Sequence, residues 1–436
     1  MLTKRKAHAT KTRLGIYAAT AVWLCASAPL TAQDWPQWRG PDRDGRVVGF
    51  EAPATWPNEL TRQWQVTVGD GVATPALVGD RIYVAGREND EEVTRCLNAD
   101  TGEEIWKDHY AAEAVRGPAQ SFGGPRSSLS VADGKVVLIG VQGVVSCYDT
   151  AEGKALWRNT AHEGTVPRFA ASSSPLLMDG LCIAELGSDD QGGVFVFDLS
   201  SGEKKWEWTG DGACYGSPIS ATVGDWQVVI APTASKLVIL RLSDGKLLFE
   251  MPYRQGRYNA ATPLVVNDTL ILAGPERGIT ARKLSASGDA IAAEEVWANT
   301  DHSVQYNTPV AKEGALFGLS NLNSLFCIDM ATGKTLWSVP VGETQNAGVF
   351  RSPNVFAQQR QREGGRGRRG GRGSGGYGSV VNAGSVLMAL TPAMELVVYA
   401  PSTEEFTELA KYKIADRPTY AYPILSGNRV FVKDQE

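Results

Sequence analysis

Few residues in this chain have the type and spacing that catalysis or metal binding requires. After the first 32 residues the only histidines are His109, His162 and His302, which lie far apart and lack the spacing of metal ligands. The chain contains no G-x-S-x-G, H-E-x-x-H or phosphate-binding P-loop motif. We therefore expect structural or solvent-exposed histidines, and we predict no catalytic residue and no metal site.

Five cysteines follow residue 32, and their odd number means that they cannot all form internal disulfides. Three of them, Cys96, Cys147 and Cys327, stand six residues before a glycine, at a place that valine or isoleucine takes elsewhere in the chain. A position that accepts all three residue types is a buried strand position, where a free cysteine acts as a small apolar side chain. A disulfide between Cys182 and Cys214 is the alternative for the other two.

Arginines and tyrosines recur just before proline-led segments and are the candidate binding residues. They are Arg126, Arg168, Arg257 and Arg351, with Tyr215, Tyr258, Tyr306 and Tyr420. Residues 1–32 carry five Lys or Arg and no acid, so the remainder of this chain of net charge −5 has a net charge of −10. In an acidic body, four arginines on one face would attract anions and bind carboxylates or phosphates bidentately. The alternative is that these arginines cap turns and pair with carboxylates of neighbouring loops.

An internal repeat, which combines a turn with an aromatic residue, positions these side chains. The motif is a short strand, then x-D-x-x-T-G or a relative of it, then an aromatic four residues after the glycine. Its members are Gly102 with Trp106, Gly153 with Trp157, Gly202 with Trp206, Gly245 with Phe249, and Gly333 with Trp337. Steps of 43 to 51 residues, with one double step of 88, are typical of propeller blades. We expect the turns to be formed by Asp100, Asp149, Asp198 and Asp329, each glycine to take a positive φ, and each aromatic to pack on the neighbouring blade.

A second marker counts the repeats. A proline-led strand is followed by a turn and an alternating strand such as residues 81–84, and the turns fall at Asp80, Gly134, Gly180, Asp225, Asp268, Gly314, Gly384 and Gly427. Eight units over residues 63–436 predict an all-β fold, an eight-bladed β-propeller of four-stranded antiparallel blades. Residues 63–68 form an isolated aromatic strand that we expect to complete the last blade, which contains residues 429–432, and so close the ring. The third strand of that blade is missing from the pattern or supplied otherwise.

Three segments lie outside the blade pattern. Residues 1–32 are typical of a Sec-type signal peptide, with a basic start and an apolar stretch too short to span a membrane. Residues 33–62 form an N-terminal segment, and we expect Trp35, Trp38 and Trp56 to pin it across the propeller, with a sugar-binding platform as the alternative. Residues 357–378 are almost pure Gln, Arg and Gly, and they predict a disordered insert.

These repeats resemble the pyrroloquinoline-quinone-type (PQQ-like) propeller family, because A-x-D-x-x-T-G-x-x-x-W is similar to its tryptophan-docking motif. The resemblance extends from about residue 60 to the end, and residues 34–41 with Arg43 and Gly45 look like secreted propellers of planctomycete-type bacteria. The superfamily contains quinoprotein dehydrogenases and the outer-membrane β-barrel assembly propeller lipoprotein. The resemblance therefore implies the fold, and it leaves redox chemistry and protein binding as two different functions.

The dehydrogenase features that the resemblance implies are not matched in this chain. Quinoprotein alcohol dehydrogenases have a vicinal Cys–Cys ring, a Ca²⁺ site of Glu, Asn and Asp, and a catalytic Asp. This chain has no adjacent cysteines, and none of its carboxylates matches the catalytic base. We therefore predict no cofactor, and we keep PQQ with calcium as the alternative.

The sequence favours an exported, non-catalytic module that binds or scaffolds a protein through the loops leading into each blade. A PQQ-dependent quinoprotein oxidoreductase and a carbohydrate- or anion-binding module are the alternatives. The acidic body argues against nucleic-acid partners, and no apolar run reaches the roughly 18 residues of a transmembrane span. We expect a monomer in the periplasm or outside the cell, with peripheral envelope contact as a further alternative.

Overall fold

The structure, a computed structural model, describes residues 34–120, 122–341 and 377–436. The chain divides into two compact units, residues 1–31 and 32–436, and every described residue belongs to the second. The predicted signal peptide, candidate residue Arg351 and residues 357–376 of the predicted insert lie outside the described residues. The expectations for these segments stay predictions.

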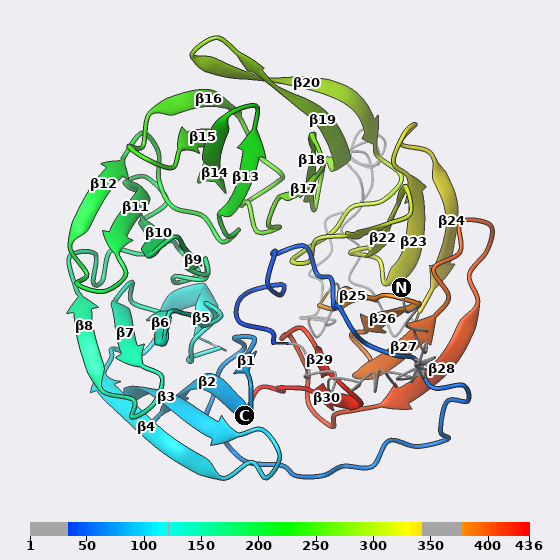
Figure 1. The fold of residues 1–436 in the computed structure, drawn as a ribbon, viewed down its shortest axis with the longest axis horizontal. Coiled ribbons are helices and arrows are strands. Elements are labelled where there is room, and N and C mark those ends of the chain that lie inside the picture. The colour runs from blue at the N-terminus through cyan, green and yellow to red at the C-terminus, as the bar shows by residue number, and fades with distance from the viewer. Residues whose placement is uncertain (1–33, 121, 342–376) are drawn as a thin grey trace, which may run out of the picture. The chain divides into compact units, whose positions relative to one another are not determined.

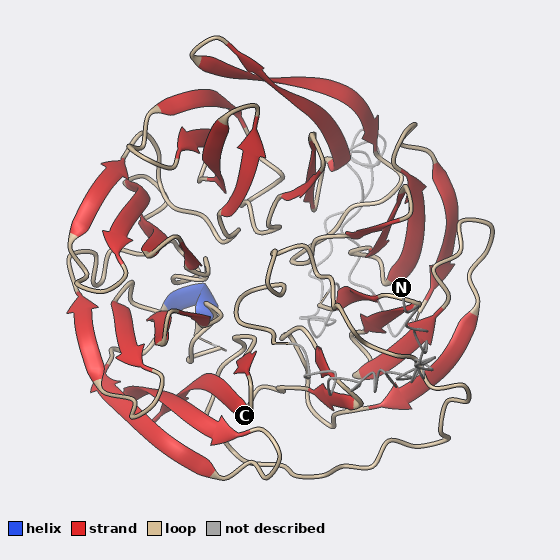
Figure 2. Cartoon of the chain, viewed as in Figure 1, coloured by secondary structure: helices blue, strands red, loops and turns tan. Residues whose placement is uncertain are grey.

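Eight antiparallel sheets make up the described unit, seven with four strands and one with two. Figure 1 shows them arranged as blades around a central axis, each with its first strand innermost. Each predicted turn joins the first two strands of one sheet, so the eight-bladed propeller is confirmed. Strands account for almost all of the described regular structure (Figure 2), and the helix that the described residues contain is the short 3₁₀ turn η1 (Gly117–Ala119).

The strands of blades 1 to 4 are β1 (Ala76–Val78), β2 (Arg81–Glu88), β3 (Glu91–Asn98), β4 (Glu104–Ala111), β5 (Ser130–Ala132), β6 (Lys135–Ile139), β7 (Val145–Asp149), β8 (Ala155–Asn159), β9 (Leu176–Met178), β10 (Leu181–Gly187), β11 (Gly192–Asp198), β12 (Lys204–Trp208), β13 (Ile219–Val223), β14 (Trp226–Pro232), β15 (Lys236–Arg241) and β16 (Leu247–Pro252). Those of blades 5 to 8 are β17 (Leu264–Val266), β18 (Thr269–Gly274), β19 (Gly278–Ser287), β20 (Ala290–Asn299), β21 (Val310–Lys312), β22 (Ala315–Leu319), β23 (Ser324–Asp329), β24 (Thr335–Pro340), β25 (Ser379–Ala383), β26 (Val386–Leu390), β27 (Glu395–Tyr399), β28 (Glu408–Lys413), β29 (Ile424–Ser426) and β30 (Arg429–Phe431).

Tryptophans of the outermost strands connect neighbouring blades. The Trp106 indole lies against Gly153 of the next blade, where a Cβ atom would come within 2.4 Å of it, and its Nε1–H donates to Thr150 O at 3.0 Å. Gly153 has a φ of 72°, so the backbone and the close approach both require glycine there. Trp157 on Gly202 and Trp206 on Gly245 repeat this arrangement.

The docking set differs in part from the sequence motif. Trp297 docks on Gly333 and Trp64 on Gly102, although neither belonged to the motif. The Trp337 indole donates to Ser402 O at 2.8 Å, whereas Phe249 has no N–H to donate. Each docking indole therefore adds a side chain-to-backbone hydrogen bond and apolar contact at a boundary between two blades.

The turn carboxylates behave as expected with one exception. Asp149 Oδ1 accepts hydrogen bonds from the backbone N–H groups of the two residues that stand two and three positions on, and Asp198 does the same. The expectation for Asp100 is wrong, because Asn98 Oδ1 takes this role in blade 1. Asp100 instead forms an ion pair with Arg429 of blade 8. It therefore connects the first blade to the last.

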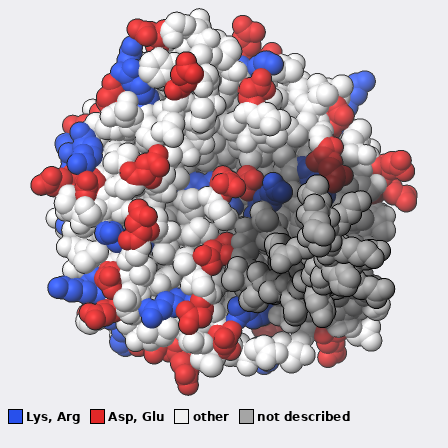
Figure 3. Space-filling model, viewed as in Figure 1, with Lys and Arg blue, Asp and Glu red and all other residues white. Residues whose placement is uncertain are grey.

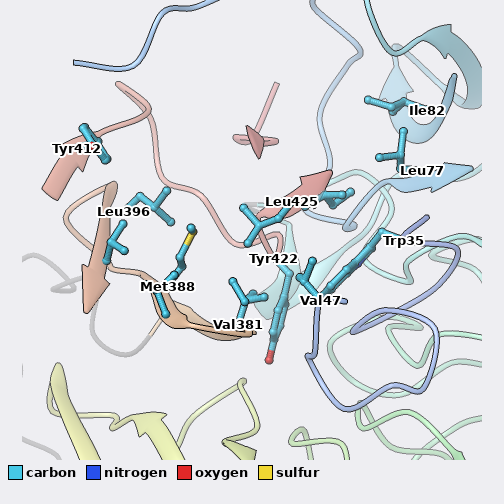
Figure 4. Close-up of a cluster of buried hydrophobic side chains, with 14 of the residues drawn as sticks. Trp35, Val47, Leu77, Ile82, Val381, Met388, Leu396, Tyr412, Tyr422 and Leu425 are labelled. Carbon is cyan, nitrogen blue, oxygen red and sulfur yellow. The ribbon is translucent and has the colours of Figure 1, made fainter. Parts of the chain in front are cut away.

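The N-terminal segment closes the ring at the boundary between blades 8 and 1. Trp64 packs on Phe431 of β30 with ring centroids 6.0 Å apart, and Val68 N donates to Glu436 O at 2.9 Å. Closure by residues 63–68 is confirmed, but these residues form no regular strand because they share no ladder with β30. Figure 4 shows Trp35 and Val47 of the N-terminal segment packed among side chains of blades 1, 7 and 8.

Candidate functional site

Hydroxyl groups at the starts of the innermost strands form a belt around the axis. The backbone N–H of one blade donates to the side-chain hydroxyl of the next, with N···O distances of 2.9 to 3.2 Å, along Thr74, Ser128, Ser174, Ser217 and Thr262. Tyr422 N of blade 8 extends the belt by donating to Thr74 Oγ1 at 3.0 Å, so that the belt spans blades 8 and 1 to 5 of the described structure. This hydroxyl belt satisfies buried backbone N–H groups that would otherwise destabilise the fold.

Residues 34–50, which we call the plug, lie over the centre of the ring (Figure 1). Arg39 of the plug is fully buried and donates to Thr308 O at 2.7 Å, to Pro309 O at 3.1 Å and to the Tyr422 hydroxyl at 2.9 Å. Trp38 packs edge-on against Tyr422, and its Nε1–H donates to Thr262 Oγ1 at 2.9 Å. The plug therefore contacts blades 5, 6 and 8 through one short stretch.

A second buried plug arginine reaches the opposite blades. Arg43 Nη1 donates to Pro218 O at 2.8 Å and to Ser174 O at 3.3 Å, and its Nη2 donates to Pro175 O. In the described structure, neither Arg39 nor Arg43 forms an ion pair with a carboxylate. Both guanidinium groups are held mainly by backbone carbonyls, so their task is to join blades.

Aromatic side chains from the loops that lead into the innermost strands form a second belt. Neighbouring rings lie 4.4 to 6.1 Å apart, centroid to centroid, along the series Phe122, Tyr420, Tyr377, Tyr306, Tyr258, Tyr215 and Phe169. In sequence Phe169, Tyr215 and Tyr306 stand two to five residues before Ser174, Pro218 and Thr308, whose carbonyl groups the plug contacts. All seven side chains of this aromatic belt are half-buried.

Hydrogen bonds fix the orientation of the belt. The hydroxyls of Tyr258 and Tyr306 are 2.8 Å apart, and Phe169 N donates to the Tyr215 hydroxyl at 3.1 Å. Burial raises the pKa of Tyr215, Tyr258 and Tyr377 above the ordinary value of a phenol. These phenols therefore stay protonated at neutral pH, and the belt offers apolar faces and hydroxyl groups without negative charge.

Arg126 completes the belt between blades 2 and 3. Its Nη1 donates to Phe169 O at 2.7 Å, and its Nη2 donates to Phe122 O at 2.6 Å and Ala119 O at 2.9 Å. Arg126 thus caps loop carbonyls, as the alternative interpretation of the arginines expected. Arg168 and Arg257 are exposed beside the belt, and the described structure gives neither guanidinium a hydrogen bond or an ion pair.

The structure brings the four candidate tyrosines together with Arg126, and it adds three aromatic residues that the sequence analysis did not select. Phe122 and Phe169 share the loops of Arg126 and Arg168, so the spacing from those arginines was an available signal. Tyr377 had no such signal, because it stands at the end of the Arg- and Gly-rich insert. Of that insert only Tyr377 and Gly378 are described, and Tyr377 is packed rather than free.

Two buried carboxyl groups lie in separate blades near this face. Glu185 on β10 accepts a hydrogen bond from Cys214 N at 2.5 Å through Oε1, whereas its Oε2 has no partner. Glu92 on β3 accepts from Val141 N at 2.8 Å and from the Tyr110 hydroxyl. Burial raises the pKa of both carboxyl groups, which favours the neutral acid. Each bonds a backbone N–H of the next loop and positions it.

The residues around the axis do not fit a quinone held with a divalent cation. The belt hydroxyls accept hydrogen bonds from neighbouring backbone, and the plug side presents two cationic guanidinium groups. Among residues 34–120, 122–341 and 377–436, no group of three His, Cys, Asp or Glu side chains is placed to hold a metal ion. All five described cysteines are free and buried, so the alternative disulfide between Cys182 and Cys214 is absent.

The visible surface carries mixed charge. Figure 3 shows the face seen in Figure 1, where Lys and Arg lie next to Asp and Glu over most of the described area. That part of the surface lacks the broad basic patch typical of nucleic-acid-binding proteins. No described helix has the length and apolar character needed to cross a membrane.

Residues 89–339 match the family model of the outer membrane protein assembly factor BamB. The chain belongs to this family. BamB of Burkholderia pseudomallei is 25% identical over 301 residues, which cover 67% of this chain and 72% of that protein. The expected resemblance to PQQ-like propellers and to their outer-membrane assembly branch is confirmed.

Solved structures agree with the BamB-family fold. The crystal structure of BamB from Moraxella catarrhalis has a TM-score of 0.59 at 14% identity, covering 86% of this chain and 97% of that chain. A europium-containing methanol dehydrogenase has a TM-score of 0.62 at 12% identity, covering 90% and 87%. At such identities both similarities concern the fold alone.

Proposed function

We propose that this BamB-family chain is an exported, non-catalytic binding or scaffolding protein that holds a protein partner on its aromatic belt. The observation that carries the proposal is the continuous belt of seven half-buried aromatic side chains with Arg168 and Arg257 exposed beside it. Aromatic residues and arginine are enriched at the centres of protein–protein interfaces, where they supply most of the binding energy.

The chemistry of the belt favours a protein over an anion. Arg126 uses both Nη1 and Nη2 on loop carbonyls, and its Nε is buried, so this guanidinium is not presented to a carboxylate or phosphate for bidentate binding. The remaining surface is protonated phenol and phenyl, which suits apolar and hydrogen-bonding side chains of a partner.

The relatives suggest where this partner is found. The curated relative with 25% identity is named an outer membrane protein assembly factor. We extend that role to this chain as part of the proposal: the mature protein works as a monomer on the periplasmic side of an outer membrane, after export by the signal peptide at residues 1–32. Its partner is then a component of an outer-membrane assembly machinery.

Site-specific photo-crosslinking tests the proposal. A benzoylphenylalanine residue replaces Tyr258 or Tyr306 in the full chain, and Val296 on the outer strand β20, 55% exposed, serves as the matched control. We expect one discrete protein adduct from both belt positions in native envelopes and none from position 296. Tyr258→Ala with Tyr306→Ala should lower adduct formation from a probe at Tyr420 at least tenfold, since each interfacial tyrosine contributes about 1–2 kcal/mol or more.

Two results would contradict the proposal. Equal adducts from the belt and from position 296 would mean that contacts are nonspecific. Binding of defined oligosaccharides that is lost in the tyrosine double variant, with no protein adduct, would favour the carbohydrate-binding alternative.

A further inference from the structure

A cavity of about 400 Å³ lies where blade 4 (β13–β16) meets blade 5 (β17–β20), two blades that are neighbours in Figure 1. Blade 4 supplies the start of β15, the end of β16 and the loop after it, and blade 5 supplies Arg277 from the turn between β18 and β19. Sites for small ligands in proteins have volumes of roughly 300–1,000 Å³. The cavity is therefore within the size range of a site for a small organic molecule.

Hydrogen bonds within and between the two blades hold the walls of the cavity in place. Tyr253 N donates to Ser235 O at 2.8 Å, and the buried Tyr253 hydroxyl donates to Ala273 O of β18 at 3.3 Å. Glu276 N donates to Gln255 O at 3.1 Å, which joins the turn of blade 5 to the loop of blade 4. The backbone around the cavity is therefore ordered before a ligand binds, so that binding costs little conformational entropy of the backbone.

Positive charge predominates among the ionisable side chains that line the cavity, which are Lys236, Glu250, Arg254 and Arg277. Lys236 Nζ and Glu250 Oε2 are 2.9 Å apart, so this pair is neutral as a whole. Within the part of the chain that the structure describes, by contrast, the guanidinium groups of Arg254 and Arg277 have no hydrogen bond, ion pair or ring contact. Two positive charges therefore line the cavity without a partner.

Two further carboxylates in the adjoining segments leave these charges in place. Asp211 accepts hydrogen bonds from Ser235 N at 2.7 Å and from Ser235 Oγ at 3.0 Å, so its carboxylate is already engaged. Glu276 is exposed and, among the described residues, forms no ion pair with Arg254 or Arg277. A guanidinium group presents paired N–H donors that match the oxygens of a carboxylate or a phosphate. The two unpartnered guanidinium groups therefore indicate a site for an anion.

We infer that the cavity binds a small organic dianion, which carries either a phosphate or two carboxylates on a short carbon body. Two negative charges neutralise Arg254 and Arg277 together, whereas a monoanion leaves one guanidinium without a counter-charge. Met251 and Pro252 line the same cavity and offer apolar contact to the carbon body. Tyr258 of the aromatic belt stands four residues after Arg254, so their Cα atoms lie at most about 14 Å apart. None of the lining residues belongs to the belt, so the inference does not rest on the proposed function.

Isothermal titration calorimetry of the full chain, at neutral pH and fixed ionic strength, tests the site with three probes. Phenyl phosphate and glutarate represent the two kinds of dianion, and benzoate is the monoanionic control. Arg254→Gln and Arg277→Gln each remove one charge from the cavity, whereas Arg46→Gln, the matched control, removes an exposed arginine of the plug. Modification by phenylglyoxal, followed by mass spectrometry, reports independently which arginines of the unaltered protein a bound dianion protects.

We expect one dianion to bind saturably at submillimolar concentration, and benzoate to bind at least tenfold more weakly. Either cavity variant should weaken binding of the dianion at least tenfold and Arg46→Gln should not, and the bound dianion should protect Arg254 and Arg277 from phenylglyoxal but leave Arg46 reactive. Tighter binding of phenyl phosphate assigns a phosphate, and tighter binding of glutarate assigns a dicarboxylate.

Two results would overturn the inference. The first is no saturation at millimolar concentration, or an equal loss of binding in all three variants, because the contacts would then be nonspecific. The second is that neither dianion binds while Arg254→Gln and Arg277→Gln lower adduct formation from the photo-crosslinking probe at Tyr258. The two arginines would then belong to the interface with the protein partner, and the proposed function would stand without the anion site.

Discussion

Replacement of Arg39 by methionine tests whether the plug holds the ring together. The side chain is fully buried and makes five hydrogen bonds, three of them to Thr308, Pro309 and Tyr422 of blades 6 and 8. A hydrogen bond to a charged group contributes about 1.5–3 kcal/mol, and the acceptors left behind remain buried. Methionine retains apolar packing and the cavity can admit water, so we expect a loss of about 3–5 kcal/mol in the free energy of unfolding.

Calorimetry and urea titration at pH 7 measure this loss. Unfolding entropy of about 0.8 kcal/mol/K for a chain of this size converts it to a fall in Tm of about 4–6 °C. Arg46→Met is the matched control, because Arg46 lies in the same segment with an exposed side chain. Arg39→Lys should fall between the two, since an ammonium group cannot reach all five acceptors. A loss below about 1 kcal/mol, or an equal loss in the control, would refute the role of the plug.

Three further predictions concern the blades. Gly202→Ala should lower the free energy of unfolding by about 2–4 kcal/mol in urea titrations, because the residue has a φ of 73° and a Cβ would lie 2.7 Å from the Trp157 indole. Trp157→Phe should lower it by about 1–2 kcal/mol. If either variant were as stable as the wild type, the docking of Trp157 on Gly202 would be contradicted. Thr74→Val should lower the free energy of unfolding by about 1–3 kcal/mol because Tyr422 N loses its acceptor, whereas Thr74→Ser should stay within about 1 kcal/mol of the wild type. A valine variant as stable as the wild type would disprove the stabilising role of the hydroxyl belt. Burial lowers the pKa of Lys433 to about 8, so between pH 8 and 10 the folded state binds fewer protons than the unfolded state. The wild type should therefore gain stability relative to Lys433→Met as the pH rises over this range. A difference in stability that stays constant with pH would contradict the lowered pKa.

Local turn chemistry explains why the blade count could be predicted from the sequence. A turn that contains an aspartate and a glycine with positive φ is determined by a few residues adjacent in sequence, so each turn can be predicted without knowledge of the fold. Trp297 was missed because blade 5 replaces the short turn by the long hairpin of β19 and β20, which leaves no glycine four residues before it. Asp100 was misassigned because it stands two residues before Gly102, whereas Asn98 stands four residues before it, at the place that Asp149 and Asp198 take before their own glycines.

The axis of the propeller was the part least accessible to sequence reasoning. Arg39 and Arg43 lie in a segment without repeats, so nothing in the sequence names the carbonyls that they contact hundreds of residues away. The tyrosines were found because they recur at one place in successive blades. Tyr377 was not selected because it belongs to the Arg- and Gly-rich insert, whose composition predicted disorder. Its packing on Tyr306 and Tyr420 depends on contacts among blades 6, 7 and 8, which the sequence does not reveal.

The plug has a consequence for the order in which the chain can fold. It is synthesised first, yet Arg39 bonds to Tyr422, 383 residues away, and Val68 bonds to the backbone of Glu436. Contacts of such sequence separation form late, because closing a long loop costs entropy before the contact stabilises it. Arg43 finds its acceptors in blades 3 and 4, whereas the Arg39 guanidinium and the Trp38 ring lack Tyr422 until the eighth blade has been made. A polypeptide that has not yet made blade 8 therefore leaves Trp38 without its ring partner and Arg39 without its hydroxyl acceptor, so part of the plug stays exposed to solvent until late in folding.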